Sequence, residues 1–182
     1  YYVDDRSDKV VEAAGAGTDL VYARISYTLT AHVEKLTATG SSSINLTGNA
    51  LANTIKGNSG ANKINGGTGN DTLYGGAGRD IFVFDKALNA RTNKDRIMDW
   101  SAPSDTIQLE NAVFKKLTKT GTLSASFFRL GSKALDANDY VGYNKATGDL
   151  WYDANGSAAG GQVVFANIGA NKAIASNDFV VI

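Results

Sequence analysis

Two nine-residue units in tandem make up residues 66–83, GGTGNDTLY followed by GGAGRDIFV. Each unit begins with six residues typical of a turn, the last of which is Asp71 or Asp80. Three residues typical of a strand follow, and the middle one is the apolar Leu73 or Phe82. The apolar position recurs upstream every nine residues, and a glycine column accompanies it. The apolar column is Leu46, Ile55, Ile64, Leu73 and Phe82, and the glycine column is Gly48, Gly57, Gly66 and Gly75. A short fixed period with one apolar residue per unit indicates a coiled β architecture in which units stack on one another.

A column of side-chain oxygens stands two residues before the apolar column. Its members are Asn53, Asn62, Asp71 and Asp80. One buried Leu or Ile stabilises a unit by only about 1.5–3 kcal/mol, which is less than the cost of ordering nine residues. The units therefore need a further source of stability, and the oxygen column suggests a bound hard cation.

The repeat places turns on top of one another in alternate units. Two successive units make one full turn of a flattened coil, so the turn from Gly48 stacks on that from Gly66, and the turn from Gly57 stacks on that from Gly75. Glycine permits positive φ and can expose backbone carbonyls inward. Calcium accepts six to eight oxygens in irregular geometry and mixes carboxylates with carbonyls.

We therefore predict two calcium ions. One lies between Asn53 and Asp71, and the other lies between Asn62 and Asp80. Magnesium would demand a stricter octahedron. The glycines of the turns are the further predicted ligand positions, through their carbonyls: Gly48, Gly57, Gly66, Gly69, Gly75 and Gly78.

Composition excludes several other classes of protein. Eighteen basic and eighteen acidic side chains cancel within the 182 residues, so no overall charge attracts nucleic acid. Cysteine is absent, which excludes disulfides and zinc–thiolate sites. Apolar runs are too short for a transmembrane segment, and the first residues lack the pattern of a signal peptide. No carboxylate pair is placed as a general acid and base, so we expect no enzyme.

The rest of the chain reads as short strands. Alternation predicts one strand over 21–29 and a second over 33–39. After the repeat we expect a short helix over 112–117, an antiparallel hairpin over 140–152 around the turn 144–148, and further strands at 83–85, 96–100, 106–109, 126–130 and 163–165. The predicted fold is all-β: a parallel β-roll (β-helix-like) of nonapeptide repeats over 48–85, an N-terminal β-strand flank over 1–47, and an antiparallel C-terminal β-cap over 86–182.

Both full units resemble the calcium-binding nonapeptide G-G-x-G-x-D-x-U-x of repeats-in-toxin (RTX) proteins. The units from Gly48 and Gly57 resemble degraded copies with Asn at the sixth position. The stretch 80–84 followed by 95–100 is similar to the segment that closes the roll in secreted RTX proteases and lipases. That similarity implies Asp99 and Asp95 as additional calcium ligands.

The C-terminal residues 177–182 resemble the uncleaved signal read by type I secretion machinery. The resemblance implies a secreted, extracellular module that folds on calcium and stabilises a covalently linked N-terminal domain absent from this chain. The same run can also be the last strand of the cap, with Phe179 and Val181 packed inward. Both uses are compatible, because export precedes folding.

Two further features leave alternatives open. Asp153-x-Asn155-Gly156 has the spacing that opens an EF-hand loop, but Val164 stands where the loop's last Glu is expected, so a plain turn and a separate calcium site are both open. Trp100, Trp151 and Tyr152 could form a sugar-stacking platform or part of the core. The alternative function is accordingly a polysaccharide- or cell-surface-binding module, which would use these aromatics or the flat face of the roll.

Overall fold

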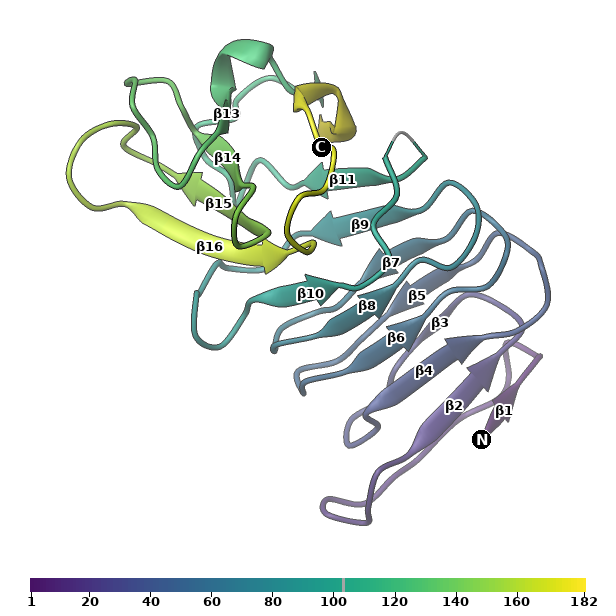
Figure 1. Cartoon of the computed structure of the whole chain (residues 1–182). Helices are drawn as coiled ribbons and strands as arrows, with labels where there is room; N and C mark the ends of the chain where they lie inside the picture. Colours follow the sequence, from purple (N-terminus) through teal and green to yellow (C-terminus); the bar gives the residue numbers. More distant parts are fainter. Residues whose placement is uncertain (103) are drawn as a thin grey trace.

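The computed structural model describes residues 1–102 and 104–182. Apart from two short 3₁₀ turns, the regular secondary structure of these residues is β-strand, arranged in two sheets (Figure 1). One sheet, here sheet A, has the strand order β1-β2-β4-β6-β8-β10-β16-β15-β14-β13. The other, sheet B, has the order β12-β17-β11-β9-β7-β5-β3. Within the described residues, no helix is long and apolar enough to cross a membrane. The predicted all-β fold with a parallel β-roll is confirmed.

The strands of the roll pair in parallel throughout, and from β2 onward successive strands alternate between the two sheets. Sheet A receives β1 (Tyr2–Val3), β2 (Leu20–Ala23), β4 (Lys35–Ala38), β6 (Thr54–Lys56), β8 (Thr72–Tyr74) and β10 (Asp95–Ile97). Sheet B receives β3 (Tyr27–Thr28), β5 (Asn45–Thr47), β7 (Lys63–Asn65), β9 (Ile81–Phe84) and β11 (Thr106–Leu109). The N-terminal flank thus contributes strands to the same two sheets as the repeats.

The apolar column of the repeat forms the core between the sheets. In sheet A the register aligns Leu36, Ile55, Leu73 and Ile97. In sheet B it aligns Leu46, Ile64, Phe82 and Ile107. Every one of these side chains is at most 2 % exposed. Because successive side chains of a strand point to opposite faces, one apolar residue per three-residue strand is enough to fill this interior.

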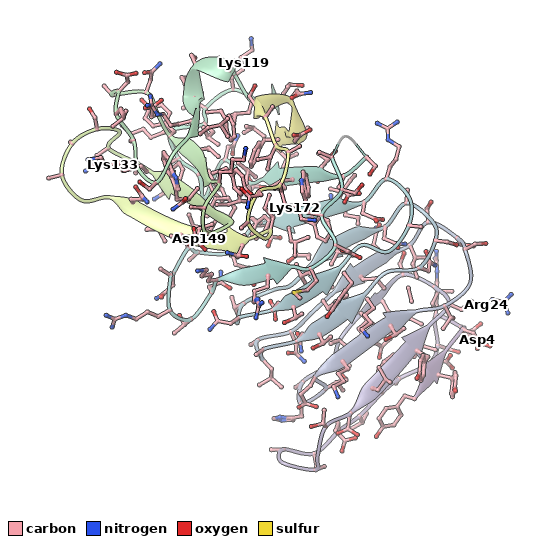
Figure 2. The ribbon with its side chains drawn as sticks, viewed as in Figure 1. Asp4, Arg24, Lys119, Lys133, Asp149 and Lys172 are labelled. Carbon is pink, nitrogen blue, oxygen red and sulfur yellow. The ribbon has the colours of Figure 1, made fainter. Side chains whose placement is uncertain are left out.

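The C-terminal cap continues both sheets of the roll (Figure 1). Its elements are β12 (Gly121–Thr122), the 3₁₀ turn η1 (Ala125–Phe127), β13 (Phe128–Leu130), β14 (Val141–Asn144), β15 (Asp149–Asp153), β16 (Gln162–Asn167), the 3₁₀ turn η2 (Ser176–Asp178) and β17 (Phe179–Val181). Strands β14, β15 and β16 are antiparallel, which confirms the predicted hairpin. Strand β16 pairs in parallel with β10, and β17 pairs in parallel with β11. In Figure 2, Asp149 and Lys172 lie where the cap meets the roll, and Asp4 lies at the opposite end.

Three predicted elements are wrong in detail. The strand predicted over 21–29 is two strands in opposite sheets, β2 and β3, because the chain must cross the coil between them. The helix predicted over 112–117 is a series of turns closed by single hydrogen bonds such as Val113 N to Glu110 O (2.9 Å), since six residues are too few to stabilise a helix. The first half of the strand predicted over 126–130 is η1, where the Ser124 side chain accepts from Ser126 N.

Of the two roles left open for Trp100, Trp151 and Tyr152, the structure supports the core and not the sugar-stacking platform. Trp100, Trp151 and Tyr152 are all buried. The indole N–H of Trp100 donates to Ala173 O (3.1 Å), and that of Trp151 donates to Gly131 O (2.8 Å). Stacking on a sugar requires an exposed ring face, so these three residues belong to the core.

Candidate metal centres

The turns of the repeat stack along two edges of the roll. Turn 48–53 lies on turn 66–71, where Thr68 N donates to Asn49 O (3.2 Å). Turn 57–62 lies on turn 75–80, where Ala77 N donates to Asn58 O (3.2 Å). This is the stacking predicted from the repeat. We call the space between turns 48–53 and 66–71 the first cradle, and the space between turns 57–62 and 75–80 the second cradle.

Glycine at the first position of each unit leaves the cradles open. A Cβ atom on Gly48 would lie 2.1 Å from Gly66 O and 2.5 Å from Asn53 Oδ1. A Cβ atom on Gly57 would lie at the same distances from Gly75 O and Asn62 Oδ1. Each cradle therefore brings a backbone carbonyl oxygen and a side-chain amide oxygen close together. Any residue other than glycine at position 48 or 57 would place its Cβ atom between them.

Further carbonyls enter the cradles opposite glycines that adopt positive φ. Gly67 and Gly69 have φ of 93° and 122°, and their equivalents in the next unit have φ of 90° and 120°. A Cβ on Gly67 would meet Asn49 O at 2.3 Å, and one on Gly69 would meet Leu51 O at 2.4 Å. L-residues with a Cβ atom rarely adopt this conformation. Glycine is therefore needed here both for the positive φ and for the close approach of the carbonyl oxygens.

Asp71 and Asp80 each direct one carboxylate oxygen to the turn above and leave the other without a partner. Asp71 Oδ1 accepts from Asn53 N (2.7 Å), and Asp80 Oδ1 accepts from Asn62 N (2.8 Å). Both side chains are 1 % exposed, and the Oδ2 atom of each is buried without a hydrogen bond. A buried anionic oxygen with no partner is strongly unfavourable. The geometry fits a cation that would use Oδ2 of each residue.

The raised pKa values of the buried carboxyl groups also favour a bound cation. Burial raises the pKa of Asp80 to about 6. Burial, together with the charge of Asp95, raises the pKa of Asp71 well above its ordinary value, and burial also raises the pKa of Asp95. A divalent cation stabilises the ionised form of its ligands, so it would offset this cost.

The carboxylate column continues beyond the repeat. Asp71 N donates to Asp95 Oδ1 (3.1 Å), and Asp80 N donates to Asp105 Oδ1 (3.2 Å). Asp95 and Asp105 are both buried. Asp95 was among the residues predicted from the sequence, but Asp105 was not. A signal for it exists, since Asp105 stands two residues before buried Ile107, as Asp71 stands two residues before Leu73.

The other predicted ligands lie elsewhere. Both carboxylate oxygens of Asp99 accept hydrogen bonds, from Gly75 N (2.8 Å) and Gly76 N (2.9 Å). Asp99 therefore lies on the side of turn 75–80 that faces away from the second cradle. Asp153 and Asn155 lie in the cap, where Asp153 Oδ1 accepts from Asn155 N (3.1 Å) and Asn155 Nδ2 donates to Ala159 O (3.3 Å). These bonds close a turn that is separate from both cradles.

Acidic side chains alone do not form a metal cluster in the part of the chain that the structure describes. No three or more His, Cys, Asp or Glu residues gather there around a point that could hold an ion. An ion in either cradle would take most of its ligands from carbonyl and amide oxygens, with one carboxylate from the lower turn. Calcium tolerates such a ligand set, because its coordination is irregular and oxygen-rich.

Residues 47–82 match the family model of the RTX calcium-binding nonapeptide repeat in four copies. This segment is an RTX repeat block. The match confirms the resemblance of the nonapeptide units from Gly48 to Val83, and calcium binding is the property of this repeat family. A search of curated proteins finds no match to the chain. The RTX match ends at Phe82, so Asp95, Asp99 and Asp105 lie outside it.

Proposed function

We propose that the RTX block binds one calcium ion in each cradle and that this binding completes folding of the roll. The observation that carries the proposal is the buried, unpartnered Oδ2 atom of Asp71 and of Asp80. Asn53 and Asn62 would supply amide oxygens from the turn above. Bound calcium would neutralise the carboxylate and join oxygens from two turns that have little apolar area between them.

Calcium concentration would then decide where the chain folds. An ion that binds only the folded state stabilises it by about 2.7 kcal/mol per site when its concentration is 100 times the dissociation constant. Extracellular calcium modules have dissociation constants of about 10⁻⁴–10⁻³ M. The chain would stay loose in the cytosol and fold outside the cell. Its role would be passage through type I secretion machinery and stabilisation of a linked N-terminal domain, with no catalytic activity of its own.

The position of the C-terminal run supports this order of events. Strand β17 lies between β11 and β12 in sheet B, and Phe179 is fully buried. A secretion signal in residues 177–182 would be readable only while the chain is unfolded. Folding that waits for external calcium would keep it readable during export.

Isothermal titration calorimetry on the calcium-free protein tests the proposal. Wild type should bind calcium. Asp71→Ala and Asp80→Ala should each abolish calcium binding in one cradle or weaken its calcium affinity by at least about tenfold, the equivalent of about 1.4 kcal/mol. Asp149→Ala is the control, because Asp149 lies in the cap and pairs with Lys94 (3.0 Å). Equal effects of all three substitutions, or no calcium binding by wild type, would overturn the proposal.

The alternative of a polysaccharide- or cell-surface-binding module now rests on the outer face of sheet A. There Tyr2, which is 81 % exposed, stacks on Tyr22 with ring centroids 5.1 Å apart. A glycan panel probed with the calcium-loaded protein separates the two functions. The calcium proposal expects no glycan ligand, whereas the alternative requires one.

A further inference from the structure

Two more spaces between stacked turns lie on the N-terminal side of the cradles. The first closed space lies between residues 30–34 and turn 48–53, and the second closed space lies between residues 39–44 and turn 57–62. The RTX units that border them differ from the later units at the second position. Asn49 and Asn58 stand there, where the later units have Gly67 and Gly76.

Asn49 fills the first closed space with its amide group. Its Nδ2 atom donates to Thr30 O (2.7 Å) and to Val33 O (2.8 Å), and its Oδ1 atom accepts from Leu51 N (2.8 Å). This orientation of the amide is unambiguous, because a carbonyl only accepts and a backbone N–H only donates. Asn53 adds a second amide donor, from Nδ2 to Val33 O (3.1 Å).

Asn58 repeats the arrangement in the second closed space. Its Nδ2 atom donates to Thr39 O (3.2 Å) and to Ser42 O (3.0 Å), and its Oδ1 atom accepts from Gly60 N (2.8 Å). The sixth position of the turn above is Ile44, which is buried and has no side-chain oxygen. Carbonyl oxygens that could face a cation are here bonded to an amide, and an NH₂ group cannot coordinate a cation.

We propose that Asn49 and Asn58 take the place of calcium in the two closed spaces. The contacts that the RTX copies make with stacked turns are then of two kinds. Copies 48–56 and 57–65 are joined to the preceding turns by asparagine amides without a metal. The same copies are joined to the following turns, 66–71 and 75–80, through the cradles. This inference rests on the proposed function of the cradles, and it assigns calcium control only to the turns from Gly66 onward.

The division has a consequence for calcium binding. Turns 48–53 and 57–62 are ordered before calcium arrives, and they hold the upper half of each cradle in place. The ordering cost that accompanies calcium binding then falls on the lower turns alone. A site that is half formed in advance binds more tightly than one assembled from two disordered turns.

NMR hydrogen exchange on the intact chain tests the inference directly. The side-chain NH₂ protons of Asn49 and Asn58 should exchange at least about tenfold more slowly than those of exposed Asn138, the equivalent of about 1.4 kcal/mol. The protection should be present both in EGTA and in excess calcium. Backbone amides of turns 66–71 and 75–80 should gain protection only with calcium. Exchange of the Asn49 and Asn58 amides as fast as that of Asn138, in either condition, overturns the inference.

A variant series gives a second measurement. Asn49→Gly and Asn58→Gly should lower the urea midpoint in EGTA, and Asn138→Gly, the matched control on an exposed loop, should not. Equal midpoints for all three variants contradict the inference. Failure of the proposed function has a different appearance: wild type would bind no calcium while the Asn49 and Asn58 amides stayed protected in EGTA.

Discussion

Each cradle contains one carboxylate and one amide oxygen, so it carries a single negative charge for a divalent ion. Asn53→Asp and Asn62→Asp should tighten calcium binding, because an added unit charge about 4 Å from a cation is worth about 4 kcal/mol per unit of cation charge at an effective dielectric of 20. The gain is partly offset by the loss of amide hydrogen bonds, worth about 1 kcal/mol each.

The same substitutions should destabilise the calcium-free chain. Asn53→Asp removes the hydrogen bond to Val33 O and buries a second charge. Calorimetry should therefore show higher affinity, and urea unfolding in EGTA should show a lower midpoint. Asn45→Asp, which adds the same charge at an exposed position of β5, is the control. Affinity unchanged or weakened in the Asn53 and Asn62 variants contradicts the role given to the oxygen column.

The raised pKa of Asp80 predicts a pH dependence of opposite sign with and without calcium. In the calcium-free fold its pKa is about 6, compared with an ordinary value of 3.8. The folded state then binds the extra proton between these values, so its stability falls as pH rises from about 4 to about 6. Calcium competes with that proton, so affinity should be about tenfold weaker at pH 5 than at pH 7. Calorimetry at both pH values checks this, and equal affinities would refute it.

Spacing alone identified the residues of the cradles, because Asn53, Asn62, Asp71 and Asp80 share one position of a nine-residue period. The spacing did not identify Asp105, because the nine-residue period is broken before it. It follows Asp80 by 25 residues, whereas Asp80 follows Asn62 by 18. The amide contacts of Asn49 and Asn58 could not be predicted either, since a side chain at the second position of a turn has several local partners and only the stacked turn shows which it uses.

Among the elements, the turns depend on glycine more than the strands do. Gly48→Ala should weaken calcium binding and destabilise the loaded protein by about 1–3 kcal/mol, because its Cβ would lie 2.1 Å from Gly66 O. Gly131→Ala is a matched control, since its Cβ would have no neighbour closer than 3.8 Å and its φ is not positive. Thermal melts in calcium compare the two. A loss of stability at position 131 as large as that at position 48 would contradict the account of the cradles.

The turn–strand units of the repeat could be predicted because the glycine, oxygen-bearing and apolar positions all recur with the same nine-residue period. Outside the repeat, alternation over 21–29 predicted one strand where the chain makes two. The pattern of apolar and polar residues continues unchanged through the crossing at 24–26, so it carries no signal for the change of sheet. The pairing of β16 with β10 was not predictable, because it joins Asp95 to Ala166 across the whole cap.

For the whole molecule, the shared use of residues 177–182 makes a prediction about export. A chain that lacks them should be secreted less well than the intact chain from a host with a type I exporter. Removal of β17 also destabilises the fold, because β17 pairs with β11. Leu109→Ala, which removes a buried side chain from β11 and leaves the terminal run intact, is the control. Equal secretion of the truncated and intact chains, or equal loss in both variants, contradicts a signal at this end.

For the molecule as a whole, an anomalous difference map from crystals grown with calcium shows whether calcium ions lie between the stacked turns. We expect a calcium peak in the first cradle beside Asp71 and another in the second cradle beside Asp80. We expect no peak in either closed space, where the side-chain amides of Asn49 and Asn58 donate to backbone carbonyls. A map with neither cradle peak, from crystals that contain calcium, would show that calcium does not bind between these turns.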